Sequence, residues 1–152
     1  MKAIIGLGNP IKSDDGIGIR IVREVEKKDL PPNVKVFDAG TGGMNIFHLL
    51  RDSERTLIID AVRFGREPGD SVFFSPEEVK SLNKSKSTHD TNILEVLELS
   101  KTLNEEPKEI IIMGVEPKDT SFGEGLSPKL EGRLPELTDD LFEKVVEVLG
   151  PQ

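Results

Sequence analysis

Three short apolar runs, rich in Ile and Val, constrain the fold of this chain more than any other feature of its sequence. Such runs, with few polar interruptions, are typical of parallel strands that are buried on both faces. The runs are Ala3–Leu7, Leu57–Ile59 with Ala61-Val62, and Ile110–Val115. Val34–Phe37 is predicted as a fourth strand. Ser71–Phe74 is predicted as a fifth, antiparallel strand at an edge of the sheet, because a short turn-like segment precedes it.

Helical patterns fill the intervals between these runs. Apolar residues recur at helical spacing in four sets: Ile17, Ile21 and Val25 with Val22; Met44, Phe47 and Leu50; Ile93, Val96, Leu97 and Leu103; and Leu141, Val145, Val148 and Leu149. Strand–helix alternation predicts a three-layer α/β sandwich, with a mostly parallel twisted sheet of about five strands and helices on both faces. A chain of 152 residues fits a single domain, so we expect one domain over residues 1–152.

Composition excludes several classes of function. The chain has no cysteine, which rules out a disulfide framework, a thiol nucleophile and a zinc–thiolate site. Its formal net charge is −8, so its surface repels phosphate backbones, and we expect no nucleic-acid partner. The apolar stretch at the N-terminus is short and is interrupted by Gly6, Gly8 and Pro10, so it reads as a strand rather than a signal peptide or membrane span. We therefore expect no membrane partner and a cytoplasmic location.

Acidic residues follow or interrupt the predicted strands. Asp14 and Asp15 come after the first strand, Asp38 after the second candidate, and Asp60 lies in the next. His89 lies just before a predicted helix. Ligand sites of such folds lie beyond the carboxyl ends of the strands. If the sheet brings these segments together there, Asp15, Asp60 and His89 offer two carboxylates and an imidazole to a divalent transition metal.

Each of these residues also has a structural interpretation. Asp14 or Asp15 can cap the helix that starts near Gly16, and one of the two is expected to do so. Asp38 is expected to bond to the glycine-rich turn that follows it. Asp60 interrupts an apolar strand, where a buried acid is costly unless it is paired or ligated, which favours a functional role.

The two histidines differ in context. His89 can be an exposed loop residue, although the adjacent helix N-terminus favours the neutral imidazole that a metal needs. His48 lies within a helical pattern and is interpreted as structural or exposed.

Three other motif interpretations fail. The glycines at positions 6 and 8 are not followed by a third glycine at the dinucleotide-binding offset, and Pro10 and a polar loop precede the helix. The same turn lacks the Gly-Lys-Ser/Thr ending of a phosphate-binding loop. The chain also has no Gly-x-Ser-x-Gly serine hydrolase elbow.

A set of ordered motifs resembles the hydrogenase maturation endopeptidases and covers nearly the whole chain. The resemblance opens with Ile5-Gly6-Leu7-Gly8-Asn9-Pro10 and Asp14-Asp15-Gly16-Ile17-Gly18. It continues through Asp38-Ala39-Gly40-Thr41-Gly42-Gly43-Met44, Leu57-Ile58-Ile59-Asp60-Ala61, Pro68-Gly69, Thr88-His89, Gly114-Val115-Glu116-Pro117 and Leu126-Ser127-Pro128. The acidic loop combined with the downstream Asp and His is far more specific than a single glycine turn.

The resemblance implies a fold, an activity and a site. The fold is phosphorylase/hydrolase-like, with a twisted sheet between helix layers. The activity is removal of the C-terminal extension of the nickel–iron hydrogenase large-subunit precursor after nickel insertion. The metal-contacting, catalytic positions of the family match Asp15, Asp60 and His89, and the nickel is expected to come with the substrate rather than to be held tightly by the protease. The large-subunit precursor is the implied partner, and we expect the protease to be a monomer.

Two alternative functions belong to other classes of protein. Peptidyl-tRNA hydrolases also begin with a strand and a Gly-Leu-Gly-Asn-Pro turn, but they need a histidine soon after it, and the first histidine here is His48. A nickel-sensing or chaperone module could use the same three ligands without cutting a peptide bond. A cleavage assay separates that module from a protease.

Overall fold

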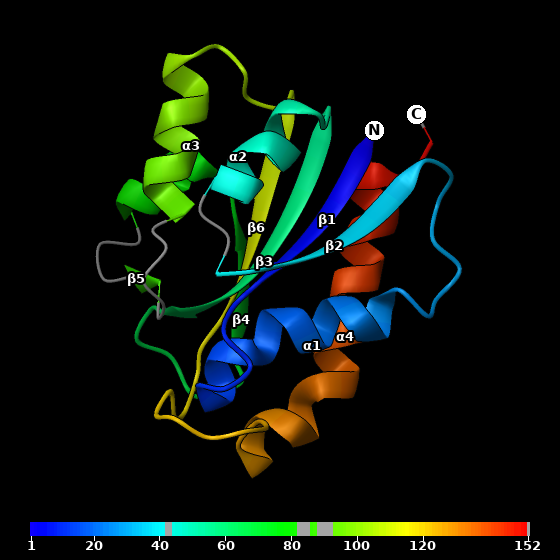
Figure 1. Cartoon of the computed structure of the whole chain (residues 1–152). Helices are drawn as coiled ribbons and strands as arrows, with labels where there is room; N and C mark the ends of the chain where they lie inside the picture. Colours follow the sequence, from blue (N-terminus) through cyan, green and yellow to red (C-terminus); the bar gives the residue numbers. More distant parts are fainter. Residues whose placement is uncertain (42–43, 82–85, 88–92, 152) are drawn as a thin grey trace.

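A computed structural model describes residues 1–41, 44–81, 86–87 and 93–151. Its centre is a twisted sheet of five strands in the order β2-β1-β3-β6-β4 (Figure 1). The strands are β1 (Lys2–Leu7), β2 (Val34–Gly40), β3 (Arg55–Arg63), β4 (Ser71–Phe74) and β6 (Glu109–Val115). All five predicted strands are therefore confirmed, with ends that differ by a few residues.

The sheet is mostly parallel, as predicted. The pairs β1–β2, β1–β3 and β3–β6 are parallel, whereas the edge strand β4 runs antiparallel to β6. A further short strand, β5 (Lys86–Ser87), pairs antiparallel with the end of β3. The carboxyl ends of β1, β2, β3 and β6 therefore point to one edge of the sheet, where sites of such folds lie.

Among the residues that the structure describes, four α-helices cover the two faces of the sheet (Figure 1). They are α1 (Ile17–Val25), α2 (Met44–Arg51), α3 (Ile93–Thr102) and α4 (Pro128–Leu149). The described part of the chain also has two 3-10 helices: η1 (Ser13–Gly16), which directly precedes α1, and η2 (Pro76–Ser81), which follows β4. The sequence predicted the four α-helices but neither 3-10 helix, since a single tight turn has no apolar periodicity of its own.

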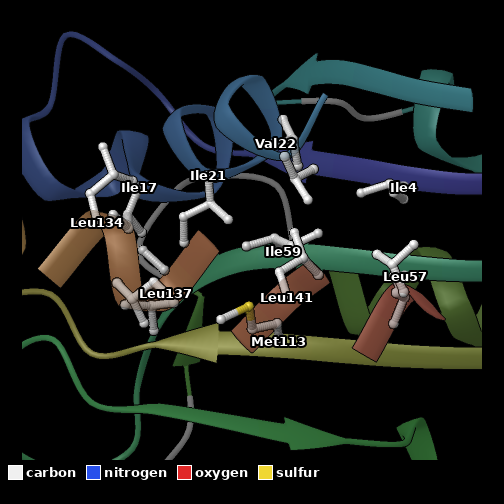
Figure 2. Packing of buried hydrophobic residues seen from close by; sticks show 14 of the residues in the cluster. Ile4, Ile17, Ile21, Val22, Leu57, Ile59, Met113, Leu134, Leu137 and Leu141 are labelled. Atoms are coloured by element: carbon white, nitrogen blue, oxygen red, sulfur yellow. The ribbon is translucent and has the colours of Figure 1, made fainter. Parts of the chain in front are cut away.

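The larger core lies between the sheet and the pair α1 and α4 (Figure 2). Ile17, Ile21 and Val22 of α1 meet Leu134, Leu137 and Leu141 of α4 over Ile4, Leu57, Ile59 and Met113 of the sheet. The helical spacing of these apolar residues produces one continuous buried stripe on each helix. This core holds α1, and with it the preceding helix η1, against the sheet.

The opposite face of the sheet carries α2 and α3. Its core joins Ile46 and Leu50 of α2 and Leu97 of α3 to the strand residues that alternate with the first set, among them Ile5 and Ile58. Alternation along each strand sends successive side chains to opposite cores. The prediction of a three-layer α/β sandwich is therefore confirmed.

The last helix differs from its prediction. It begins at Pro128, well before the apolar pattern that indicated it, and contains Pro135. Glycine and proline in its first half hide the helical pattern, although Ser127 as N-cap and Pro128 in the first turn are typical start signals. Within the part of the chain that the structure describes, no helix is long and apolar enough to span a membrane.

Candidate active site

The turn after β1 brings the backbone of the first motif into contact with η1. Gly8 has φ +140°, and a Cβ atom placed on it would lie 2.0 Å from the carbonyl oxygen of Asp15. Only glycine permits this approach. The next residue, Asn9, donates its backbone N–H to Oδ2 of Asp15 at 2.8 Å. The Gly-Asn-Pro turn therefore serves to position Asp15.

Asp15 is fully buried in η1, and η1 lies against β3. The close contact continues at Gly18, where a Cβ atom would lie 2.5 Å from the carbonyl oxygen of Leu7 and 2.4 Å from that of Ile59. Two glycines thus allow the segment 13–18 to lie directly on the end of β1 and on β3 at Ile59. Ile59 is the residue immediately before Asp60, so this packing holds the start of α1, and with it η1, close to the backbone at Asp60.

Asp60 is also fully buried, within β3 rather than at its end. The ladder between β1 and β3 ends at the pair Gly6–Ile59, so Asp60 is the first β3 residue beyond β1. On its other side it lies in register with Gly114 of β6. Asp60 therefore interrupts β3, which continues to Arg63, as the sequence indicated, and it lies at the carboxyl edge of β1.

His89 lies outside the residues that the structure describes. The strand before it, β5, ends at Ser87, which pairs with Val62, two positions beyond Asp60. Among the described residues, no three His, Cys, Asp or Glu side chains are grouped so that they could hold a metal ion. The predicted cluster of Asp15, Asp60 and His89 includes one residue outside that range, so it stays a prediction.

Asp14 has a structural role that the sequence did not reveal. Its buried carboxylate accepts the backbone N–H groups of Lys118, Asp119 and Ser127 at 2.9, 3.0 and 2.7 Å, and the hydroxyl of Ser127 at 2.8 Å. The expectation that Asp14 or Asp15 caps α1 was wrong, because the N-cap of α1 is Gly16 without a side-chain cap, and the contacts of Asp14 reach the start of α4 instead. Asp14 therefore ties η1 to the segment after β6.

The other two candidates behave as their structural interpretations predicted. Oδ1 of Asp38 accepts the backbone N–H of Gly40 at 3.1 Å, and Oδ2 forms an ion pair with Arg23 at 2.8 Å. Asp38 therefore stabilises its turn and the contact with α1. The exposed ring of His48 lies edge-on to Phe47 with a centroid separation of 5.6 Å.

Two further residues hold the site edge in place and were quoted only as parts of motifs. The buried Glu116 accepts the backbone N–H groups of Phe64 and Arg66 at 3.0 and 2.9 Å, which fixes the turn between β3 and β4. Ser127 caps α4 by accepting the N–H of Leu130, while its own groups donate to Asp14. An acid after a strand and a Ser-Pro pair before a helix are the signals that could have indicated these roles.

Two ionisable groups near this edge have shifted pKa values. The backbone N–H of Ser121 hydrogen-bonds to Asp119 and lowers the pKa of that carboxyl, with a further contribution from the side chain of Ser121. A two-pronged hydrogen bond to Glu131 raises the pKa of the Arg20 guanidinium. Asp119 therefore carries a charge at neutral pH, and the Arg20–Glu131 pair links α1 to α4.

The described part of the predicted metal site consists of two carboxylates. Two buried carboxylates lie on adjacent elements, and carboxylate oxygens bind many divalent metals. Burial of such acids is costly unless they are paired or ligated. No three such donors are grouped together in the part of the chain that the structure describes, so the described residues form at most an incomplete metal site.

Comparison with protein families gives a match over most of the chain. The family model HycI, described as hydrogenase maturation protease, matches residues 19–144. Among curated proteins, the hydrogenase 2 maturation protease of Escherichia coli is 31% identical over 134 residues, which are 86% of this chain and 82% of that protein. Hydrogenase expression/formation protein HupD of Bradyrhizobium diazoefficiens is 30% identical over 135 residues, 86% of this chain and 70% of that protein. The chain spans 61% of the length of HupD from Thiocapsa roseopersicina.

Solved structures show the same fold. The hydrogenase maturating endopeptidase HybD of Escherichia coli superposes with a TM-score of 0.84 and 29% identity, covering 96% of this chain and 92% of that one. The maturation protease HycI of Thermococcus kodakarensis superposes with a TM-score of 0.73 at 20% identity, covering 95% of this chain and 91% of that one. The second of these supports the fold alone.

Proposed function

The chain belongs to the hydrogenase maturation protease family and is an endopeptidase of that family, and from this membership we propose its substrate and the way it recognises it. The substrate is the large-subunit precursor of a nickel–iron hydrogenase. The reaction removes the C-terminal extension of that precursor once nickel has been inserted. The proposal extends to the whole of residues 1–152 as one protease domain that acts as a monomer in the cytoplasm.

One observation carries this proposal: the two fully buried carboxylates of Asp15 and Asp60 on the adjoining elements η1 and β3. Asp15 accepts a backbone N–H from Asn9, and both acids lie at the carboxyl edge of β1. Like charges brought close together raise each other's energy. A divalent ion is attracted to both carboxylates and offsets that cost.

His89 is the proposed third ligand. The pairing of Ser87 with Val62 brings the chain to within two β3 positions of Asp60, and His89 follows Ser87 by two residues in the sequence. Val62 and Asp60 lie on the same face of β3 because side chains alternate along a strand. These facts support a nitrogen ligand on the side of the sheet to which Asp60 points.

The donor set explains why the nickel is proposed to come with the substrate. Firm catalytic metal sites usually have three protein ligands and often use two or three histidines. This chain has two histidines in all, one of them the exposed His48, and no cysteine. Two carboxylates and one imidazole bind weakly by themselves, yet they can complete the coordination of an ion that the precursor already holds. Cleavage then depends on nickel loading, which rejects immature precursor.

The direct test compares two precursors with one protease preparation. The protease is stripped with a chelator, freed of it, and mixed with nickel-loaded or nickel-free precursor. We expect the loaded precursor to be cut at least about 100-fold faster, which corresponds to roughly 2.7 kcal/mol of differential binding in the transition state. The readout is the mass of the large subunit and of the released peptide. Equal cleavage rates on the two precursors contradict nickel recognition. Absence of cleavage of either precursor contradicts the proposal that the large-subunit precursor is the substrate.

A second assay addresses the rival class. Peptidyl-tRNA carries no nickel to which the proposed ligands could bind, and the negatively charged chain repels tRNA. We expect no release of peptide from peptidyl-tRNA and no measurable tRNA binding at physiological salt. Efficient turnover of that substrate contradicts the proposed substrate and reopens the interpretation of the Gly-Leu-Gly-Asn-Pro turn.

A further inference from the structure

Two loops at the site edge are joined by backbone hydrogen bonds although more than one hundred residues separate them. Lys12 forms a parallel β-bridge with Gly123. The N–H of Ser13 donates to the carbonyl oxygen of Gly123, and the N–H of Gly123 donates to that of Ile11, both at 2.9 Å. The hydroxyl of Ser13 also donates to the carbonyl oxygen of Ser121 at 2.8 Å. We call the joined segments, residues 9–13 and 119–126, the paired loops.

The paired loops expose two large apolar side chains. Phe122 is 81% exposed and Ile11 is 53% exposed, and each directly precedes one partner of the bridge. Phe122 is the most exposed large apolar side chain among the described residues. Its ring lies 6.0 Å from Nζ of Lys12. Exposed apolar groups on a backbone fixed by this many hydrogen bonds are typical of binding surfaces, because little entropy is lost when they are covered.

A pocket of about 250 Å³ lies at the paired loops and has Ile11 in its wall. Its walls also include Pro10 and Leu126, with Gly16 and Gly125 leaving room between them. Arg20 and Glu124 line it too, and the Arg20 guanidinium is already paired with Glu131. Pockets for whole small molecules span roughly 300–1,000 Å³, so this one fits one or two apolar side chains instead.

The pocket and the proposed metal site share helix η1. Ser13 and Gly16, the first and last residues of this helix, line the pocket. Asp15 lies between them in the sequence and is fully buried. Asp15 therefore lies within one helical turn of two residues that line the pocket.

Because the pocket and Asp15 share η1, we propose that the pocket and the paired loops bind an apolar side chain of the precursor's C-terminal segment, next to the bond that is cut. This inference rests on the proposed function, because it names a contact of the same substrate. The pocket receives the side chain, and Ile11 and Phe122 cover it and its backbone. The pocket and the paired loops therefore contribute to substrate binding, whereas Asp15, Asp60 and His89 bind the nickel.

The test uses Phe122→Ala, Ile11→Ser and the double variant in the full-length protein, with nickel-loaded precursor. We expect each single variant to raise KM about tenfold, as the loss of an interface anchor does, with kcat within about twofold. Val146→Ser is the matched control, because Val146 is 52% exposed on α4 and does not line the pocket. We expect its KM to equal that of the wild type.

Substitutions in the precursor identify the partner side chain. Apolar residues near the cleavage site are changed to Asp one at a time. One of them is expected to raise KM about tenfold for the wild type but less than about threefold for the double variant, because contacting groups are not additive. Unchanged KM values for Phe122→Ala and Ile11→Ser overturn the inference, as does a dimer of the wild type that these changes dissociate. If the wild type does not cut loaded precursor, the proposed function fails before this test begins.

Discussion

An Asp60→Asn variant is expected to cut nickel-loaded precursor about 1,000-fold more slowly than the wild type, a loss of roughly 4 kcal/mol of transition-state stabilisation. The substitution keeps the shape of the side chain but removes its negative charge from a fully buried position in β3. A neutral amide is a much poorer ligand for a divalent metal than a carboxylate. His89→Ala and Asp15→Asn are expected to have effects of the same order.

The fold of the Asp60→Asn variant is expected to survive. Burial of a charge opposes folding, so its removal offsets part of any lost interaction. We expect the free energy of unfolding, measured in urea, to change by less than about 2 kcal/mol. Loss of cleavage with an intact fold then identifies a role in catalysis or substrate binding. A variant that cuts loaded precursor within about tenfold of the wild-type rate contradicts the assignment of Asp60.

Asp38→Asn is the matched control. Asp38 also lies at the carboxyl edge of the sheet, in β2, but its carboxylate pairs with Arg23 and the turn at Gly40. Asparagine keeps the acceptor for the Gly40 N–H, and the lost ion pair is exposed and worth less than about 1 kcal/mol. We expect cleavage within about threefold of the wild type. If Asp38→Asn lowers the cleavage rate as much as Asp60→Asn does, the effect comes from the negative charge at this edge in general and not from a specific metal ligand.

The strands were the part of the fold best predicted from the sequence. Buried parallel strands need nearly continuous apolar runs, and β1, β3 and β6 have them, with Asp60 as the interruption in β3. The edge strand β4 followed from the short turn before it. Helix α4 was found only in its second half, because Gly132 and Pro135 interrupt the pattern where packing and the Ser127 cap still hold the helix. Tertiary contacts outweigh local propensity at that point.

The site was predicted less completely, and the reason lies in contacts between distant segments. Two adjacent acids, Asp14 and Asp15, are equivalent in sequence, but the first turns to Ser127 and the second to Asn9. No local pattern distinguishes them. The bridge between Lys12 and Gly123 joins residues 111 positions apart, so no window of sequence contains it. The family resemblance supplied what spacing could not, namely which acid to assign to the metal.

Removal of the Asp14 carboxylate is expected to destabilise the protein by about 4 kcal/mol, since four donors lose a charged acceptor and each such bond contributes roughly 1.5–3 kcal/mol before water replaces part of it. Those donors are three backbone N–H groups and the Ser127 hydroxyl. Asp14→Ala should therefore lower the urea midpoint without changing the slope. A domain of ordinary stability has only about 5–15 kcal/mol in total, so the variant is close to unfolding at growth temperature.

Asp119→Ala separates this role from a general effect of removing acids. Asp119 is in the same segment and accepts the N–H of Ser121 at 2.8 Å, but its carboxylate is exposed, so water replaces the lost contact. We expect a far smaller change in the urea midpoint than for Asp14→Ala. Because Asp14 joins η1 to the start of α4, Asp14→Ala should also lose cleavage in proportion to its unfolded fraction and regain it on cooling. A stable Asp14→Ala protein without activity assigns Asp14 to the substrate site and contradicts its structural role.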